Sequence, residues 1–478
     1  MSLGNTFCHL EGDLSLSPGE RIHMVGIGGI GMQGLALLAL GEGFLVSGSD
    51  REERAGMKLL RERGIDVFIG EDPQRVEGAA AVVYSLAVSE ECAEIKRARE
   101  RGIPLYSRAD LLGFLGKRYP IRIGIAGTHG KSTVTAMVGQ ILRKAGWEPT
   151  VVCGAFLQGD TPFWQGRDEV LVYEACEYGD SFLATSPTVA AVTNVEFDHP
   201  DWFRSGDAVR SSFLRFLRKP TVKTAVLPAE EPLRASLPGD RPCYTFGQGG
   251  AVSAKKLSQK DGCVSFLLTE RGGDSVGVNL GVPGLFQLEN ALCAAAVCLA
   301  VGVDPGRIAE GLESYAGIGR RMEKKGLREG IVFYVDYAHH PTEIALSLAT
   351  ARELAKGRLI TVFQPHTYSR TRALFDGFVR ALGEARCLAI LAPYGARETK
   401  DPLRGAERLA EDLRVTYLSD RENAAAWIRK TAREGDTVLL LGAGDVNTVF
   451  DAFNPREECE GPEHGSCRSF PPSPREAR

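Results

Sequence analysis

The sequence predicts an α/β fold of three domains, in which a Rossmann-like domain stands on each side of a central α/β sheet. Three observations predict it. The chain has 478 residues, more than a single hydrophobic core usually holds. Two glycine-rich turns, at 26–31 and 127–132, each follow a short apolar run and precede a helical pattern. Strand and helix patterns alternate regularly again after residue 330.

The first glycine turn belongs to a predicted N-terminal domain over 21–118, which follows a loose lead-in at 1–20. A strand at 21–25 leads into Gly26-Ile27-Gly28-Gly29-Ile30-Gly31, and a helical stretch follows at 33–41. A second strand, from Phe44, ends in Asp50, 19 positions after Gly31. Such glycines let backbone approach a pyrophosphate closely, and the acidic residue accepts from a ribose hydroxyl. A nicotinamide or flavin cofactor, a UDP-sugar, and a tight turn without ligand all remain open here.

The rest of this region continues the same alternation. Runs at 66–70 and 80–85 have the composition of strands, and 90–102 reads as a charged helix that ends at Gly102. Lys117-Arg118-Tyr119-Pro120 has the composition of a linker.

The second glycine turn opens a predicted central domain over 119–319, of the P-loop ATPase type. An Ile-rich strand at 121–126 ends in Gly127-Thr128-His129-Gly130-Lys131-Ser132, and a helical apolar spacing follows from Ser132. Free amide groups at the start of that helix would bind a phosphate, Lys131 adds a positive charge, and the Ser132 hydroxyl can reach Mg²⁺. The turn is shorter than a standard P-loop, because Ile125 stands where the first glycine belongs. A ligand-free glycine turn is the alternative.

Acidic and imidazole groups follow two later strands of this domain. The run 169–173 ends in Glu174, and the run 188–193 leads into Asn194 to His199. Ligands collect at the carboxyl ends of parallel strands, so these groups are expected beside Lys131, where a carboxylate with Ser132 suits Mg²⁺ and His199 serves a second ion. Residues 220–275 are expected to form an antiparallel edge, followed by a closely packed alanine-rich helix at 291–301.

A linker at 317–323 leads into a predicted third domain over 320–453, parallel and doubly wound. Its strands are expected at 331–335, 358–363, 388–391, 415–418 and 437–441, and its helices at 342–356, 371–382 and 421–433. The first strand ends in Asp336-Tyr337-Ala338-His339-His340 and the second in Gln364-Pro365-His366, both at the functional edge. Adjacent histidines point in different directions, so one ligand-facing and one structural histidine are expected, not a metal pair.

Composition narrows the class of protein. The formal charge of −4 and pI near 6.2 argue against nucleic-acid or membrane-surface binding. No apolar run is long enough to span a bilayer, and the N-terminus lacks a signal-peptide pattern. The 11 cysteines are scattered without a CxxC pair, which indicates a reduced, cytoplasmic setting. The tail at 454–478 is expected to be disordered, and its Cys459, His464 and Cys467 make a poor zinc site.

Several motifs together resemble the Mur ligase family from about residue 21 to 450. They are GTHGKST (127–133), EACEYGDSF (174–182), TNVEFDH (193–199), DYAHHPTE (336–343) and FQPHTYSRT (363–371), with GIGGIGM and VSGSD in the N-terminal region. The resemblance implies an ATP-dependent ligase of peptidoglycan precursor synthesis. Its implied substrates are UDP-N-acetylmuramate and L-alanine, joined at the lactyl carboxylate through an acyl phosphate. It also implies two Mg²⁺ ions, no nucleic-acid or membrane partner, and a monomer or weak homodimer.

The resemblance also implies roles for individual residues. Catalysis is carried over to Lys131, Glu174, His199 and His339, and metal binding to Ser132, Glu174 and His199. ATP contacts are carried over to Gly127, Thr128, His129, Gly130, Lys131, Ser132, Thr133, Asn290, Arg321 and Asp336. The UDP-sugar is expected at Gly28, Gly29, Ile30, Gly31, Asp50 and Ser85, and the acyl phosphate and amino acid at Tyr337, His366 and Arg370.

The match has departures, and other functions remain open. Ser132 replaces a usual Thr, Thr367 stands where many members carry Arg, and Gly179-Asp180 stands where members often have a basic pair or an acidic run. A sister ligase that adds a preformed peptide or another amino acid, a nicotinamide-dependent oxidoreductase, and a non-catalytic ATP-binding regulator are the rivals. If Lys131 and His339 act together, the second and third domains must close on one another.

Overall fold

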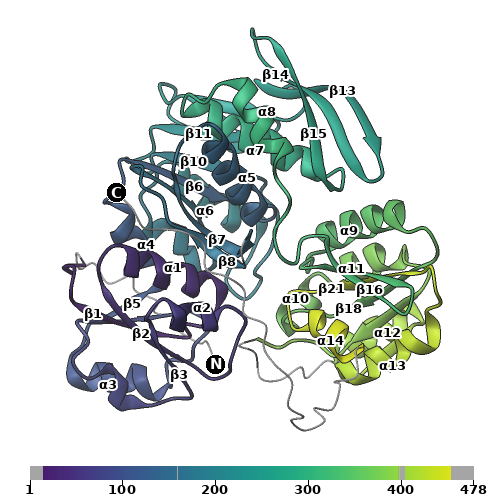
Figure 1. Ribbon diagram of the computed structural model, residues 1–478, viewed down its shortest axis with the longest axis horizontal. Helices are drawn as coiled ribbons and strands as arrows, with labels where there is room; N and C mark the ends of the chain where they lie inside the picture. Colours follow the sequence, from purple (N-terminus) through teal and green to yellow (C-terminus); the bar gives the residue numbers. More distant parts are fainter. Residues whose placement is uncertain (1–13, 159, 397, 399–403, 454–478) are drawn as a thin grey trace, which may run out of the picture.

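The protein is a three-domain α/β structure, as predicted, with one sheet in each domain (Figure 1). The computed structural model describes residues 14–158, 160–396, 398 and 404–453. The tail with Cys459, His464 and Cys467 lies outside the described residues, as does most of the lead-in. The exact domain boundaries stay predictions.

The N-terminal sheet is parallel, with strand order β3-β2-β1-β4-β5. Since β1 lies between β2 and β4, the order reverses beside β1, which is where ligands bind in open α/β sheets. The strands are β1 (Arg21–Val25), β2 (Leu45–Asp50), β3 (Asp66–Ile69), β4 (Ala81–Tyr84) and β5 (Leu105–Ser107), and the helices are α1 (Ile30–Gly41), α2 (Met57–Glu62), α3 (Ala93–Arg101) and α4 (Arg108–Gly116).

The central sheet has ten strands in the order β15-β14-β13-β12-β11-β10-β6-β9-β7-β8. Its strands are β6 (Ile121–Ala126), β7 (Thr150–Leu157), β8 (Thr161–Trp164), β9 (Val170–Glu174), β10 (Val189–Val192), β11 (Thr224–Pro228), β12 (Cys243–Phe246), β13 (Val252–Lys260), β14 (Cys263–Glu270) and β15 (Ser275–Pro283). Its helices are α5 (Lys131–Lys144), α6 (Gly206–Leu217), α7 (Gln287–Ala300) and α8 (Pro305–Glu313). The strand β6 lies between β10 and β9, so the glycine turn after β6 stands beside the ends of both neighbours.

The C-terminal sheet has the order β16-β17-β21-β18-β19-β20. Its strands are β16 (Glu323–Arg328), β17 (Ile331–Asp336), β18 (Leu359–Phe363), β19 (Leu388–Leu391), β20 (Thr416–Leu418) and β21 (Thr437–Leu441). Its helices are α9 (Pro341–Leu354), α10 (Tyr368–Ala373), α11 (Phe375–Gly383), α12 (Gly405–Leu413), α13 (Arg421–Thr431) and α14 (Val449–Phe453).

Three expectations about these sheets need correction. The region 220–275 is not uniformly antiparallel, because β11 and β12 extend the parallel sheet and only β13, β14 and β15 pair antiparallel. The third sheet is not wholly parallel, since β16 pairs antiparallel with β17. The single helix expected at 371–382 is two helices, because the backbone at Leu374 (φ −111°) leaves the helical region. An isolated strand carries no sign of its direction, which explains the first error. The second arises because the charged segment of β16 was not predicted as a strand, whereas all the predicted strands are parallel.

The hydrophobic cores differ between the domains. One cluster of buried side chains runs from the N-terminal domain into the central one, with α1 residues such as Leu35 packed in the same cluster as Val152 of β7 and Phe163 of β8. The C-terminal sheet has a separate cluster on each face. The first two domains therefore share apolar packing, whereas the C-terminal domain keeps its own core.

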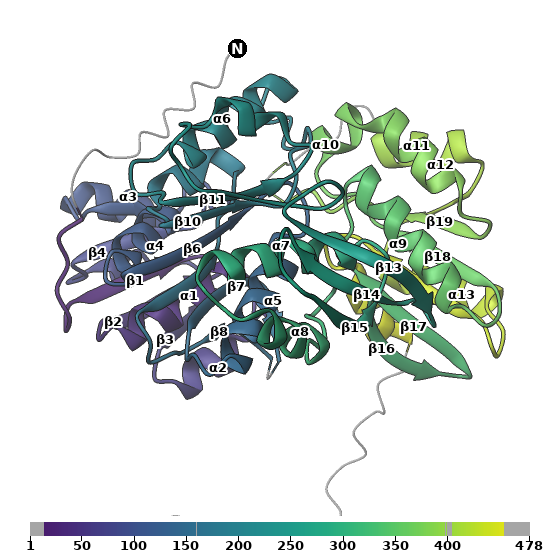
Figure 2. The ribbon, with the colours of Figure 1, turned by 90° about the horizontal axis from the view of Figure 1, so that it is seen from above.

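The C-terminal domain faces the carboxyl ends of the central strands. In the view of Figure 2, β13 and β14 of the central sheet lie beside α9. The Gln259 amide in β13 donates to a Glu353 carboxylate oxygen in α9 over 2.5 Å. The cavities of the candidate site lie along this boundary.

Candidate active site

The turn after β6 has the backbone geometry of a phosphate-binding loop. Gly127 and Gly130 have φ values of +141° and +79°, which residues other than glycine rarely adopt. Among the described residues no side chain caps α5, so the helix start presents amide groups to a ligand. Asn194 holds the loop, because its Oδ1 accepts from the His129 amide (2.9 Å) and its Nδ2 donates to the His129 carbonyl (3.1 Å).

The side chain of Lys131 folds back onto the glycine loop that precedes it. Its ammonium group donates to the Gly127 and Thr128 carbonyls (2.5 and 3.0 Å) and to Glu177 (3.0 Å), whose side chain is 3 % exposed. Burial works to lower the pKa of Lys131, but the charges of Glu177 and Glu174 outweigh it and raise that pKa above its usual value. A cation is therefore fixed at the position where phosphate oxygens would approach.

Ser132 and Glu174 form the pair that suits a magnesium ion. The Ser132 hydroxyl donates to Glu174 Oε2 over 2.6 Å, and the Gly154 amide donates to the same oxygen over 3.0 Å. A hydroxyl and a carboxylate converging at the helix start are oxygen ligands of the kind Mg²⁺ takes beside nucleotide phosphates. These residues fit the ion that the sequence predicts.

His199 lies at the other wall of the same cavity. Its Nε2 is 3.5 Å from Glu177 Oε1, and its ring lies 4.9 Å from the ring of Tyr178. The backbone of His199 has a φ of +54°, which turns the chain sharply after Asp198. His199 is therefore beside the Lys131–Glu177 pair, close to Lys131 as the sequence predicts, and its role as a metal ligand stays a prediction.

The C-terminal domain contributes a buried ion pair to this wall. Arg370 donates from Nε and Nη2 to the two oxygens of Asp198 (2.7 and 3.2 Å), and both side chains are 4 % exposed. Burial alone would raise the pKa of Asp198, but Arg370 holds it well below the usual value. The remaining Arg370 nitrogen contacts His366 Nδ1 (3.1 Å). Arg370 thus joins the two domains, and its guanidinium is already committed to protein partners.

His339 is neutral in this setting. Burial lowers the pKa of His339 to about 3, aided by the nearby Arg370 charge. Its Nδ1 lies 2.9 Å from the Tyr337 carbonyl, and its ring is 6.0 Å from that of His366. Tyr337 lies beneath the guanidinium groups of Arg320 and Arg321 (4.7 and 5.4 Å to the ring centroid). The residues expected around the acyl phosphate therefore all come from the C-terminal domain and lie on the side of the cavity opposite the phosphate loop.

One cavity of about 220 Å³ collects most of these groups. Its lining includes Lys131, Ser132, Glu174, Glu177, Asp198, His199, Arg321, Tyr337, His339, His366 and Arg370. The sequence missed Glu177, Asp198 and also Glu343, which binds Arg321 over 3.1 Å. All three lie inside the motifs EACEYGDSF, TNVEFDH and DYAHHPTE. Each motif contains more than one acidic residue, and the sequence does not indicate which of them faces the site.

A larger cavity of about 600 Å³ continues from the phosphate loop between the same two domains. Gly130, Thr133, Asn290, Arg321 and Asp336 line it, as expected for nucleotide contacts, together with the apolar side chains of Leu257, Leu285, Phe286 and Leu288. Leu257 and Leu285 are 50 % and 49 % exposed, which leaves an apolar wall that suits a flat base. Asp336 is also structural, because its oxygens accept from the Met322 and Ala338 amides (both 2.8 Å).

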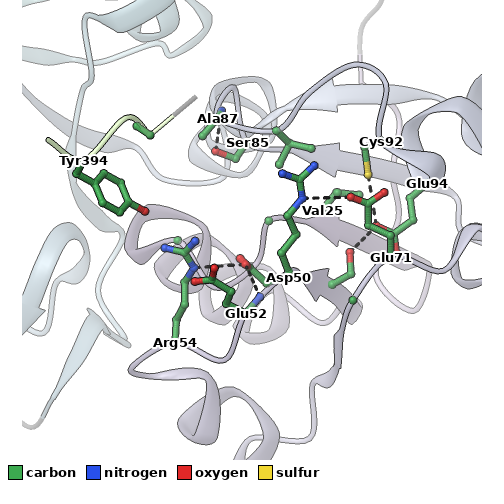
Figure 3. Close-up of a pocket in the computed structure, with 17 residues that line it drawn as sticks. Val25, Asp50, Glu52, Arg54, Glu71, Ser85, Ala87, Cys92, Glu94 and Tyr394 are labelled. Atoms are coloured by element: carbon green, nitrogen blue, oxygen red, sulfur yellow. Dashed lines mark hydrogen bonds and ion pairs between the residues drawn. The ribbon is translucent and has the colours of Figure 1, made fainter. Parts of the chain in front are cut away.

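The N-terminal cavity, of about 360 Å³, is shown in Figure 3. Gly29, Asp50 and Ser85 line it, as expected for a UDP-sugar site, with Arg51 and Arg54 as cations. Asp50 Oδ2 accepts from the Gly28 amide (2.9 Å), and Oδ1 lies 3.3 Å from Arg54 Nε. Tyr394 of the C-terminal domain faces Arg54 across the cavity (Figure 3).

The other three residues expected to contact the sugar do not line this cavity. Gly28 is behind Asp50, Ile30 lines the Lys131 cavity, and Gly31 faces the Arg108 side chain. Gly26, which has a φ of +80°, lines the N-terminal cavity. The difference arises because the glycine pattern fixes a turn, while the neighbouring strands decide which side of that turn faces the cavity.

Comparison with known proteins agrees with this geometry. Three family models match: Mur ligase family, catalytic domain, over 21–120; Mur ligase middle domain over 125–298; and Mur ligase, glutamate ligase domain, over 320–444. The UDP-N-acetylmuramate–L-alanine ligase of Caldicellulosiruptor bescii is 38 % identical over 444 residues, covering 90 % of this chain and 98 % of the relative. The enzyme of that name from Desulfosudis oleivorans is 40 % identical over 441 residues, covering 89 % and 96 %.

Solved structures show the same architecture. UDP-N-acetylmuramate-alanine ligase MurC from Thermotoga maritima superposes with a TM-score of 0.78 at 27 % identity, covering 91 % of this chain and 98 % of that one. A murein peptide ligase from Psychrobacter arcticus has a TM-score of 0.72 at 23 % identity over 91 % of this chain and 98 % of that one, which speaks to the fold alone. With all three domains matched in order, this chain belongs to the Mur ligase family.

Proposed function

We propose that this protein joins L-alanine to the lactyl carboxylate of UDP-N-acetylmuramate, at the expense of ATP, in peptidoglycan precursor synthesis. The observation that carries the proposal is the single cavity in which the phosphate loop, Glu174 and His199 face Tyr337 and His339 of another domain. The relatives at 34–40 % identity over about 90 % of the chain, all named for this reaction, support the choice of substrates.

The proposed reaction has two steps. The lactyl carboxylate attacks the γ-phosphorus of ATP, the bond to the β-phosphate oxygen breaks, and an acyl phosphate and ADP result. The amine of L-alanine then attacks the acyl carbon, loses a proton, and expels inorganic phosphate. Both steps concentrate negative charge near the transferred phosphoryl group, so positioning and cations supply most of the rate.

The residues divide this work by position. Lys131 and the first amides of α5 hold the β- and γ-phosphates, while Asn290 and the apolar wall at Leu285 receive the nucleoside. Ser132 and Glu174 would hold one Mg²⁺ and His199 a second, and these ions would neutralise the phosphate oxygens. The neutral His339 faces the acyl centre without adding a charge that would repel an approaching amine.

The N-terminal cavity is the proposed site of the uridine diphosphate. Arg51 and Arg54 supply positive charge, and the turn at Gly26 and Gly29 admits the pyrophosphate close to the backbone. We assign this reaction to the cytoplasm, where the eight described cysteines, all free, would stay reduced. Among the described helices none has the length and apolar character needed to cross a membrane.

Phosphate release decides between the candidate substrates. With ATP, Mg²⁺ and UDP-N-acetylmuramate present, we expect release to depend on L-alanine, with weaker responses to glycine and L-serine. Turnover with a preformed tripeptide and none with L-alanine would instead assign the protein to a peptide-adding sister ligase. Tight NADH binding without ATP turnover would revive the oxidoreductase alternative.

A further inference from the structure

Three side chains from two domains converge at the nucleotide cavity, which two of them line, and neither step of the proposed reaction uses them. They are His129 in the phosphate loop, Glu196 after β10, and His340 at the start of α9, and their ligand atoms all lie within 4.8 Å of one another. We propose that these residues form a binding site for a transition-metal dication of the Zn²⁺ class, which would connect the central and C-terminal domains.

The spacing of the donor atoms fits such an ion. Glu196 Oε2 lies 3.5 Å from His129 Nε2 and 3.6 Å from His340 Nδ1. Two ligands about 2.0–2.1 Å from a tetrahedral metal stand roughly 3.3–3.4 Å apart, so the two separations from Glu196 are already close to those of such a site. The two rings are inclined at 44° with centroids 4.6 Å apart, so both can face a common point.

The surroundings orient each donor in the way that histidine metal sites require. His129 Nδ1 faces Glu343 Oε1 at 3.4 Å, and His340 Nε2 faces the Phe197 carbonyl at 3.3 Å. With protons on those outer nitrogens, His129 Nε2 presents its lone pair toward Glu196. The lone pair of His340 Nδ1 accepts from the Thr342 amide (3.3 Å), and His340 would have to give up this bond to bind a metal. Thr342 Oγ1 donates to Glu196 Oε2 over 2.7 Å and fixes the carboxylate. Such outer partners set the tautomer and orientation of metal-binding histidines.

The two histidines are buried, and their polar contacts are long. The side chains of His129 and His340 are 11 % and 7 % exposed and that of Glu196 is 36 % exposed, and the ring nitrogens of His129 face carboxylate oxygens at 3.4 and 3.5 Å. His340 Nδ1 accepts only a long bond, 3.3 Å, from the Thr342 amide. Two histidines and a carboxylate select Zn²⁺ over Mg²⁺, because imidazole nitrogen suits the softer ion.

A proton is the competing occupant of the site. Burial opposes charge on His129, but Glu343 and Glu196 raise the pKa of His129 to about 9, which favours an imidazolium between two carboxylates. His340, Arg321 and His339 are the other charged or titratable groups that face these carboxylates. The negative charge that attracts a proton also attracts a dication, so the two occupants should exclude each other.

Cobalt(II) is a suitable probe, because tetrahedral Co²⁺ absorbs visible light far more strongly than octahedral Co²⁺. We expect the full-length protein, with excess Mg²⁺ filling the oxygen-rich sites, to bind one equivalent of Co²⁺ with such a spectrum and to release it to Zn²⁺. His340→Asn should remove the spectrum, and since Asn is a favoured helix N-cap residue, α9 keeps its cap. Glu196→Gln should weaken Co²⁺ binding at least tenfold.

The control is the double variant Cys459→Ser, Cys467→Ser, which should leave the spectrum unchanged, and circular dichroism should show all variants folded. The proposal is wrong if the wild-type protein gives no tetrahedral spectrum. It is also wrong if the spectrum survives both His340→Asn and Glu196→Gln, or if a thiolate-to-cobalt charge-transfer band appears and the cysteine variant abolishes the signal. Any of these results would leave the cluster as an ion-pair contact between domains.

Discussion

The two glycine turns, β1 to α1 and β6 to α5, occupy the same place between a strand and a helix but differ in electrostatics. Both begin at the end of a buried parallel strand, and in the described residues neither helix has a side-chain cap. In the first turn, Gly28 gives its amide to Asp50, and the cations Arg51 and Arg54 come from the loop after β2. In the second, Lys131 stands in the turn itself, against the carboxylates Glu174 and Glu177.

This difference teaches how one local motif serves two ligands. Amide groups at a helix start bind an anion in either case. In the second turn Glu174 and the Ser132 hydroxyl converge beside a lysine, which suits Mg²⁺-ATP. In the first turn two arginines, paired with Glu71 and Asp50, supply the donors that suit a diphosphate. The neighbouring strands, and not the glycines, therefore set the chemistry of each turn.

Removal of the Lys131 side chain should impair the activity of the second turn more than any other change. We expect Lys131→Ala to lower the rate of phosphate release about 10³-fold, because a fixed cation near the transferred phosphoryl group is lost. Lys144→Ala, an exposed change at the far end of α5, is the matched control and should keep full activity. Wild-type turnover in Lys131→Ala would support the non-catalytic regulator instead.

Glu174→Gln tests whether the second turn holds a metal ion through this carboxylate. We expect the Mg²⁺ concentration needed for half-maximal activity to rise about 100-fold, since the amide keeps the shape but loses the charge. The exposed Glu169→Gln in the same segment is the control. Chelation with excess EDTA should stop wild-type turnover, and added Mg²⁺ should restore it. An unchanged Mg²⁺ dependence in Glu174→Gln would show that the metal is held elsewhere.

The sequence predicted the elements at this site better than it predicted their partners. Apolar runs, and the turn residues that end them, predicted the strand and turn at 121–132 and the strand ends before Glu174 and His199. The pairing of Lys131 with Glu177, and of Arg370 with Asp198 across 172 positions, was not. The first pair depends on β6 and β9 being neighbours in the central sheet, and the second depends on how two domains meet. No local pattern records either arrangement.

The same limit applies to the N-terminal turn. The spacing from Gly31 to Asp50 correctly marks a strand–turn–helix–strand unit, but Gly28 and Gly31 face Asp50 and Arg108 instead of the cavity. Tyr394, which comes from another domain, completes that cavity and carries no signal in the sequence (Figure 3). Local chemistry was therefore predictable, whereas contributions from distant segments were not.

Arg54→Gln tests whether ligand binding at the first turn depends on cations from the loop after β2. We expect the KM for UDP-N-acetylmuramate to rise roughly tenfold, with a smaller change in kcat. The lost hydrogen bond from Arg54 to the charged diphosphate would weaken binding of the substrate and of the transition state equally. Arg61→Gln is the control, since Arg61 pairs with Glu53 outside the cavity. Steady-state kinetics at saturating ATP would check this. A fall in kcat alone would contradict a binding role for Arg54.

The smallest expected effect concerns backbone strain, and alanine placed in each turn measures it. At Gly130 a new Cβ meets two penalties, because φ is +79° and Asn290 Oδ1 already occupies that space, so Gly130→Ala should cost about 1–2 kcal/mol or more. At Gly28 the φ is not positive, and the new Cβ would lie 2.8 Å from Asp50 Oδ2 and 3.0 Å from Arg54 Cδ. Since those are side-chain atoms beside an open cavity, they can move, and Gly28→Ala should cost less than about 1 kcal/mol. Thermal unfolding of the two variants should therefore rank Gly130→Ala below Gly28→Ala. Equal melting temperatures would mean that the two turns are equally constrained, and that their difference lies in charge alone.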